Sequence, residues 1–245
     1  MDTVYLFILI SVISLAASFV QSVTGFGYGI IAMIFLPQLL LYTEANVLSS
    51  ILSSLTSAVS LWILRRHVNW KNLIFPLLGS GVANYFAISF VKTQKNDLLM
   101  LLLGIALVLL SLYFFLFSGK IKIRSAWYTG LIAGVISGVM GGMFSISGPP
   151  VVIYYLQSEK DTDTYVSTIS AYFVFSGALS IGMKAASGFV TENVLIGLAV
   201  GLVGMLIGAA LGNMTRHRIK PDAMKKAVYG VMAISGVWNV ISSLL

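Results

Sequence analysis

The chain is organised as long apolar runs separated by short polar stretches. Eight hydrophobic segments follow one another, at about 4–41, 47–64, 73–91, 98–117, 126–157, 164–183, 194–212 and 226–244. The run from Leu98 to Phe117 has about the 20 residues that a helix needs to cross a ~30 Å hydrocarbon core. Because the runs are continuous, they do not fit the roughly 10-residue alternating strands of a membrane barrel. The pattern predicts an all-α polytopic membrane protein.

The composition supports this interpretation, because 58% of the residues are hydrophobic and only 9% are charged, against about a quarter charged in a soluble domain. The start, Met1-Asp2-Thr3, has no basic cluster, so Val4 to Val20 is expected to be a retained span rather than a signal peptide. The chain has no cysteine, which excludes disulfides and thiolate metal ligands. The formal net charge of +7 is attributed to membrane topology rather than to nucleic-acid binding.

Two of the eight segments are interrupted by glycine-rich stretches, at 22–29 and 138–150. Each interrupted segment opens a set of four, and the next segment of each set is rich in serine and threonine. Transporter folds are often built from internal repeats with broken helices in matching places. The sequence therefore predicts two repeats, 1–118 and 119–245, within one integral membrane domain.

Basic residues collect in the loops 65–71, 120–124 and 216–226, which the positive-inside rule places in the cytoplasm. These loops share one side only if 126–157 enters the membrane and returns. Its two arms, Ala126 to Gly141 and Ser145 to Gln157, would rise about 24 Å and 20 Å, short of a full crossing. If the segment 4–41 also enters the membrane and returns, each repeat makes three full crossings besides its re-entrant segment. This odd number inverts the second repeat relative to the first and places both termini outside. We predict a multi-pass inner-membrane protein, and leave open whether 4–41 is re-entrant or makes two full spans.

The two glycine-rich breaks are the candidate substrate site. Irregular backbone at membrane depth is tolerated only where it is buried in protein or lines a watery cavity. Helix N-termini at a break expose unpaired N–H groups and the positive end of the helix dipole, which suits an anion. The alternative is that the glycines serve close helix packing. The candidate substrate-binding residues are Gln21, Ser22, Thr24, Gly25, Phe26, Gly27, Gly141, Gly142, Ser145, Ser147, Gly148 and Pro149.

Further polar residues within the segments are candidates for lining a path. Lys184 ends its segment, where snorkelling to the interface explains it as well as substrate contact does, and Asn84 fits a bond to a neighbouring helix equally well. His67 and His217 both lie in basic loops, so no metal site, proton relay or cofactor is predicted. The candidate path-lining residues are Thr56, Ser57, Asn84, Tyr172, Ser176 and Lys184.

The stretches from Phe19 to Met33 and from Gly134 to Tyr155 resemble the two signature regions of the TauE/SafE sulfite exporter family, within the 4-toluene sulfonate uptake permease superfamily. The resemblance extends over the whole chain, in length and in its four-plus-four organisation. It implies a transporter of sulfite, sulfonates or related sulfur-containing anions, with both signatures near the substrate path. Ser145 and Ser147 stand where such families often have glycine.

The sequence thus predicts a secondary transporter, and not an enzyme, that exports small sulfur-containing anions. Two alternatives stay open: a non-catalytic membrane partner subunit, and a transporter of another small organic anion. A membrane enzyme would need clustered acidic or histidine side chains, and an ATP-driven pump a phosphate-binding motif; the chain shows neither pattern. The predicted partners are a small anion and the lipid bilayer, without nucleic acid. The identity of the anion, the direction, the coupling ion and formation of a homo-oligomer stay open.

Overall fold

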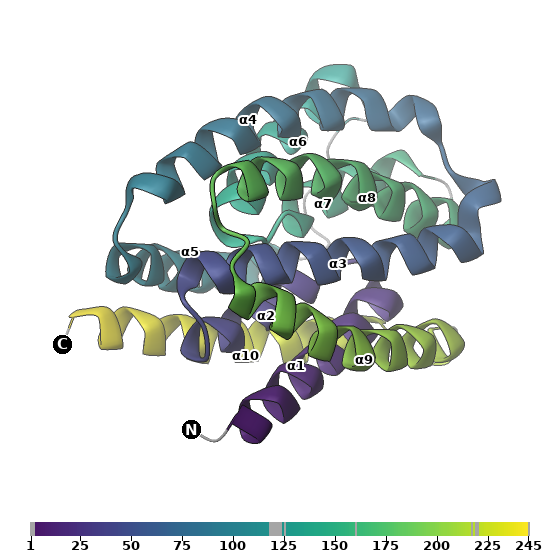
Figure 1. The fold of residues 1–245 in the computed structure, drawn as a ribbon. Helices are drawn as coiled ribbons and strands as arrows, with labels where there is room; N and C mark the ends of the chain where they lie inside the picture. Colours follow the sequence, from purple (N-terminus) through teal and green to yellow (C-terminus); the bar gives the residue numbers. More distant parts are fainter. Residues whose placement is uncertain are drawn as a thin grey trace.

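The computed structural model describes residues 3–117, 124, 126–159, 161–216, 218 and 221–244, and these form α-helices joined by short turns, with no strand among them. The α-helices are α1 Thr3–Thr24, α2 Tyr28–Phe35, α3 Tyr42–Leu64, α4 Ile74–Thr93, α5 Asn96–Phe117, α6 Trp127–Phe144, α7 Gly148–Ser158, α8 Thr162–Ala186, α9 Glu192–Thr215 and α10 Pro221–Leu244. Three short 3-10 turns are Leu36–Gln38, Arg65–His67 and Trp70–Leu73. In Figure 1, α4 and α6 lie on one side of α3 and α8, and α1, α9 and α10 lie on the other.

Seven of the described helices are long and apolar enough to cross a membrane, namely α1, α3, α4, α5, α6, α8 and α9. Both interrupted segments divide into one long and one short helix. The short ones, α2 with 8 residues and α7 with 11, rise only about 12 Å and 16 Å. The predicted polytopic helical membrane protein is therefore confirmed.

The first arm of 126–157 differs from the prediction. It was expected to end near Gly141 and to stop short of a crossing, but α6 runs 18 residues to Phe144, which is about 27 Å. Along the continued helix, Gly138 and Gly142 pack on α4, where a Cβ on Gly142 would lie 2.6 Å from Ala87 Cβ, while Gly141 faces Ser147 of the second break. The segment nevertheless returns to its starting end, since the Tyr154 ring of α7 lies 3.0 Å from the Cβ position of Gly130 in α6.

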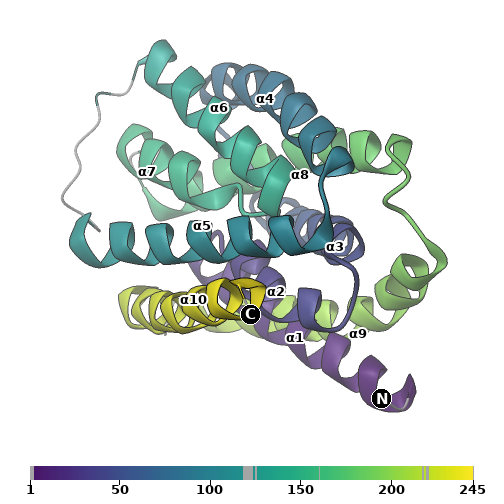
Figure 2. The ribbon, with the colours of Figure 1, turned by 90° about the vertical axis from the view of Figure 1, so that its left-hand side faces the viewer.

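Close backbone contacts join α6 to α4 and α9 to α1. A Cβ on Gly134 would lie 2.1 Å from the Pro76 carbonyl oxygen, and one on Gly204 would lie 1.9 Å from the Ser11 carbonyl oxygen. Small residues at such positions let two helix backbones approach, as is common in membranes. The glycines therefore serve close helix packing along these two helix pairs, which Figure 2 shows from another side.

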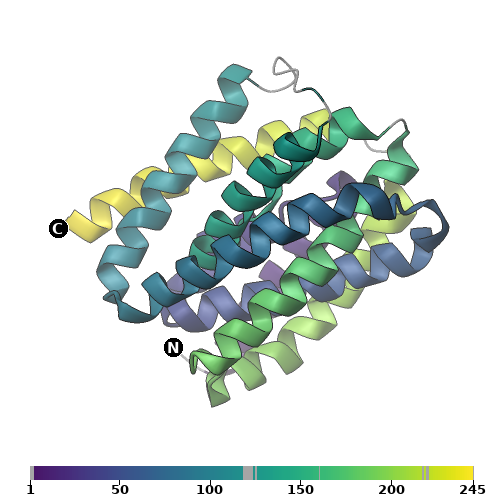
Figure 3. The ribbon, with the colours of Figure 1, turned by 90° about the horizontal axis from the view of Figure 1, so that it is seen from above.

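One end of the bundle gathers the loop between α3 and α4, the loop between α7 and α8, and the last turn of α9. The Asn69 and Asn72 amides donate to the Glu159 carboxylate at 3.1 Å and 2.7 Å. Arg216 forms an ion pair with Asp163 at 2.5 Å. Glu159, between α7 and α8, and Asp163, in the first turn of α8, therefore contact two of the basic loops directly. The marked N and C termini lie at the opposite end (Figure 3).

At that opposite end, the buried carboxylate of Glu44 joins α3 to α9. It accepts hydrogen bonds from the Thr191 hydroxyl at 2.6 Å, the Asn193 amide at 3.1 Å and the Leu41 backbone N–H at 3.3 Å. The contact with Leu41 forms part of the cap of α3. Because each donor is bound to one carboxylate, Glu44 fixes the relative position of the two helix starts.

We predict that Glu44→Leu lowers the free energy of unfolding by about 2 kcal/mol, because it leaves buried donors without an acceptor. Glu192→Leu is the matched control, since Glu192 is exposed in the first turn of α9 and its replacement is expected to change stability by no more than about 0.5 kcal/mol. SDS-induced unfolding in mixed micelles measures both. Equal destabilisation by the two substitutions would contradict the bridging role of Glu44.

Candidate functional site

The two breaks lie against each other at the centre of the bundle. A Cβ on Gly29 would lie 1.8 Å from the Ser145 carbonyl oxygen, and one on Gly148 would lie 3.1 Å from Phe26. The chain leaves α1 through Gly25 and Gly27, with φ of 83° and 107°, and leaves α6 through Ser145, with φ of 55°. Such left-handed residues commonly end helices. Among the described residues, Ser145 alone is a non-glycine with positive φ.

Gln21 holds the first break in place. Its amide nitrogen donates to the Ser53 carbonyl at 2.9 Å and to the Ser57 hydroxyl at 2.7 Å. Its amide oxygen accepts from the Ser53 hydroxyl at 3.0 Å and from the Tyr28 backbone N–H at 3.3 Å. The first N–H of α2 is thus satisfied by a side chain of α1. One side chain therefore fixes the break, the start of α2 and the face of α3 relative to one another.

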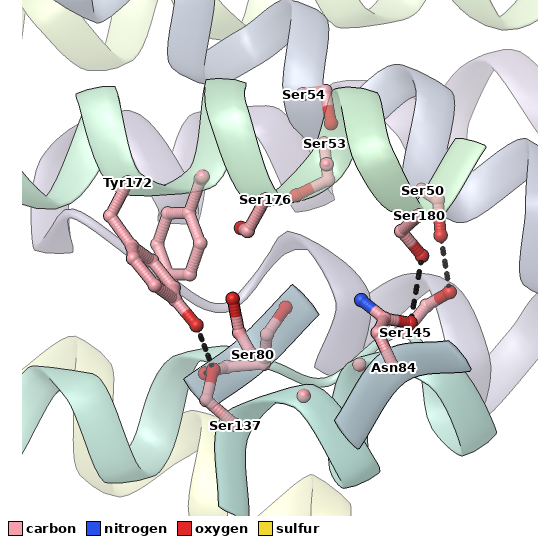
Figure 4. Close-up of a pocket in the computed structure, with 15 residues that line it drawn as sticks. Ser50, Ser53, Ser54, Ser80, Asn84, Ser137, Ser145, Tyr172, Ser176 and Ser180 are labelled. Atoms are coloured by element: carbon pink, nitrogen blue, oxygen red, sulfur yellow. Dashed lines mark hydrogen bonds between the residues drawn. The ribbon is translucent and has the colours of Figure 1, made fainter. Parts of the chain in front are cut away.

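Beside the second break lies a cavity of about 30 Å³ between α3, α4, α6 and α8. Its lining is mainly hydroxyl groups and small residues (Figure 4). A neighbouring cavity of about 20 Å³ lies between the two breaks and shares Ser53, Ser145, Ser147 and Phe173 with the first. One buried water needs about 10–15 Å³ of such space. The paired cavities therefore have room for a few polar atoms.

Some of the hydrogen-bond donors that line the first cavity have no acceptor among the described protein atoms. The Asn84 amide oxygen accepts from the Ser180 hydroxyl at 3.2 Å, while its amide nitrogen points into the cavity (Figure 4). Within the described part of the chain, that nitrogen and the hydroxyls of Ser54 and Ser147, which are half-buried, donate to no protein acceptor. None of the described residues that line either cavity carries a carboxylate. A ligand that supplies acceptors satisfies such donors, so this lining is complementary to a ligand rich in acceptors.

Lys184 places a buried amino group beside this cavity. Its side chain is 0% exposed, and Nζ donates to the Ser50 hydroxyl at 2.6 Å, the Ser145 hydroxyl at 3.1 Å and the Gly141 carbonyl at 3.3 Å. These three residues line the cavity. The described residues give Lys184 no ion-pair partner. The side chain therefore turns inward, and the alternative of snorkelling to the interface is wrong for this residue.

With this geometry established, comparison with known proteins assigns the chain to a family. The family model described as sulfite exporter TauE/SafE matches residues 10–238. The chain belongs to the TauE/SafE family. Members of this family are transporters and not enzymes, so the chain is a multi-pass membrane transporter. The probable sulfite/organosulfonate exporter TauE of Cupriavidus necator is 27% identical over 223 residues, which cover 89% of this chain and 87% of that relative. No solved structure matches the chain.

Most of the predicted TauE/SafE site residues meet at the two cavities. Those that line a cavity are Gln21, Phe26, Gly27, Asn84, Gly141, Ser145, Ser147, Gly148, Pro149, Tyr172 and Ser176. Thr24, Ser57 and Lys184 bond directly to lining residues.

The remaining predicted residues face other parts of the bundle. Gly25 faces Tyr165 and Ile169 of α8, and Gly142 faces α4. Ser22 lies against Gly212 of α9. The Thr56 hydroxyl bonds to the carbonyl of Leu52 one turn earlier in α3.

Several serines that line the first cavity were not predicted as site residues. On α3 they recur at helical spacing, which places them on one face. This spacing indicates a polar face and is the signal in the sequence that could have identified them. The missed lining residues are Ser50, Ser53, Ser54, Ser80, Ser137 and Ser180.

Proposed function

We propose that the chain is a secondary transporter that exports small sulfur-containing anions such as sulfite or organosulfonates, with the substrate bound between the two broken helices. The observation that carries this proposal is the cavity with unpaired donors beside the buried Lys184. Such a lining is complementary to an oxyanion, whose oxygens accept hydrogen bonds. The name of the Cupriavidus necator relative, a probable sulfite/organosulfonate exporter, supports the same substrate class.

The proposal includes an inverted arrangement of the two halves, 1–118 and 119–245. It is supported by the packing of helices from one half on helices of the other: α1 of the first half packs on α9 of the second, and α6 of the second half packs on α4 of the first. It is also supported by the left-handed residue at the end of both α1 and α6. Such repeats with broken helices place substrate at their interface near mid-membrane.

For orientation, we propose that the basic loops 65–71, 120–124 and 216–226 lie in the cytoplasm and that both termini lie outside the inner membrane. The positive-inside rule supports this assignment; parts of the second and third loops lie outside the described residues. An inside-negative potential favours outward movement of an anion by about 2.3 kcal/mol per charge per 100 mV, which supports export. Uptake into right-side-out vesicles that requires an inward proton gradient would contradict the direction.

Transport itself is tested with the purified chain in proteoliposomes, by flux of radiolabelled sulfite and methanesulfonate beside acetate as a carboxylate. We expect both sulfur anions to move and acetate to move more slowly. Flux of acetate without either sulfur anion would replace the proposal with transport of another small organic anion.

Binding at the cavity is tested by Asn84→Ala and Ser147→Ala. We predict that each raises the Kd for methanesulfonate about 3- to 10-fold, because each removes one neutral donor. Ser89→Ala is the control, since Ser89 is exposed on α4 and bonds the Tyr85 carbonyl within its own helix. Thermal-shift titration in detergent measures the affinity, since ligand binding raises stability. Unchanged affinity in both cavity variants would exclude this cavity as the binding site.

A further inference from the structure

The hydrogen bonds around Lys184 suit an ammonium group. Nζ faces three oxygens, those of Ser50, Ser145 and Gly141. The Ser145 hydroxyl donates to the Asn46 carbonyl at 2.7 Å, and the Ser50 hydroxyl is within 3.0 Å of the same carbonyl. The Ser50 and Ser145 hydroxyl oxygens also lie 2.7 Å apart, and either can donate to the other. Each hydroxyl proton therefore has an acceptor other than Nζ, which leaves all three oxygens able to accept from Nζ. The three hydrogens of an ammonium group match these three oxygens, whereas a neutral amine has only two.

No other charge balances this ammonium group inside the described part of the protein. Apart from Lys184, the charged side chain buried there is Glu44, whose carboxylate is bound by Thr191 and Asn193 at the end of the bundle where α3 and α9 begin. The Tyr172 phenol, which lines the cavity, donates to the Ser137 hydroxyl at 2.8 Å and is neutral. A bound anion favours the ammonium form of Lys184, so the occupied site holds one positive charge.

Charge balance then limits the ligand. A bound anion with one negative charge makes the buried site neutral, whereas a dianion leaves one negative charge without a partner. Burying an unpaired charge is costly, and neutral hydroxyl and amide donors compensate only part of that cost. The lining adds neutral donors from Asn84, Ser54 and Ser147 and no second cation.

We infer that the cavity selects anions with a single negative charge, hydrogensulfite or an organosulfonate, over the dianions sulfite and sulfate, and that Lys184 is the residue that sets this preference. The inference rests on the proposed function and refines its substrate. Sulfite then crosses in its protonated form, so the substrate carries the proton and the protein needs no buried carboxylate or histidine to do so.

The wild-type test uses the full chain in proteoliposomes with methanesulfonate, sulfite and sulfate, from mildly acidic to mildly basic pH. We expect methanesulfonate flux to be independent of pH, because its charge does not change. Sulfite flux at constant total concentration falls as pH rises, in proportion to the hydrogensulfite fraction, and sulfate flux is at least about tenfold slower than that of methanesulfonate. Sulfate as fast as methanesulfonate, or sulfite flux that rises with pH, would overturn the inference. Failure of all three to move would overturn the proposed function as well.

Two substitutions test Lys184 itself. Lys184→Gln is expected to lower methanesulfonate flux at least about tenfold, whereas Lys184→Arg keeps the charge and the preference over sulfate. The control is Lys92→Gln, at an exposed position near the end of α4, which is expected to leave flux unchanged. Retention of the full preference in a folded Lys184→Gln protein would show that another group sets it. If Lys184→Gln does not fold, as judged by size-exclusion chromatography, the wild-type pH and sulfate measurements still decide the inference.

Discussion

Replacing Gly29 with alanine is expected to lower the free energy of unfolding by about 3 kcal/mol, because the new methyl group has no space. Its Cβ would lie 1.8 Å from the Ser145 carbonyl oxygen and 2.9 Å from the Ser145 carbonyl carbon. Both neighbours are backbone atoms at the other break, so rotation of a side chain cannot relieve the contact. The substitution separates the two breaks, and we expect transport to be lost with the cavity between them.

The matched control is Gly182→Ala in α8. No heavy atom lies within 4 Å of the Cβ position of Gly182, and alanine is a better helix former than glycine by about 1 kcal/mol. This variant is therefore expected to be as stable as the wild type or slightly more stable. SDS-induced unfolding in mixed micelles and flux in proteoliposomes measure the two variants side by side. Normal stability and flux in Gly29→Ala would show that the two breaks do not need to touch.

Gln21→Met is expected to lower the free energy of unfolding by about 3 kcal/mol, with little change in side-chain volume. The thioether replaces an amide that makes four hydrogen bonds, to Ser53, Ser57 and the Tyr28 N–H. Each buried group left unsatisfied costs about 1–3 kcal/mol, and part of this is recovered when Ser53 and Ser57 form new bonds within α3.

The control for this prediction is Gln94→Met. Gln94 follows α4, and its side-chain amide bonds only the exposed Thr93 hydroxyl among the described residues, so its replacement is expected to change stability by no more than about 0.5 kcal/mol. The same unfolding measurement applies. If Gln21→Met were as stable as Gln94→Met, the four hydrogen bonds at the first break would make no net contribution to the free energy of unfolding.

Ser145 links the backbone of the second break to its chemistry. A left-handed conformation costs a residue with a Cβ roughly 1–2 kcal/mol, a cost that glycine avoids. The hydroxyl of Ser145 accepts from Lys184 and donates to Asn46. The strained serine therefore supplies an oxygen to the buried ammonium that a glycine could not supply.

The amino-acid sequence was sufficient to predict the helices and the position of the breaks. Span length is a local property, because a helix rises by a fixed amount per residue and the hydrocarbon core has a fixed thickness. Glycine and proline likewise act locally on the backbone, so the interruptions at 22–29 and 138–150 were visible without any knowledge of packing. The family signatures lie in the same two stretches.

Tertiary structure alone decided which side chains face the cavity. Lipid and protein interior are both apolar, so a membrane helix shows no strong pattern that separates its inner face from its lipid face. Lys184 is equally compatible with snorkelling by sequence, yet it is buried because Ser50, from α3, and Ser145, from the second break, accept its hydrogens. Likewise, α6 continues past Gly141 to Phe144, and Gly142 packs on α4. Contacts between segments far apart in the chain, and not local pattern, therefore determined the charge and the donors of the site.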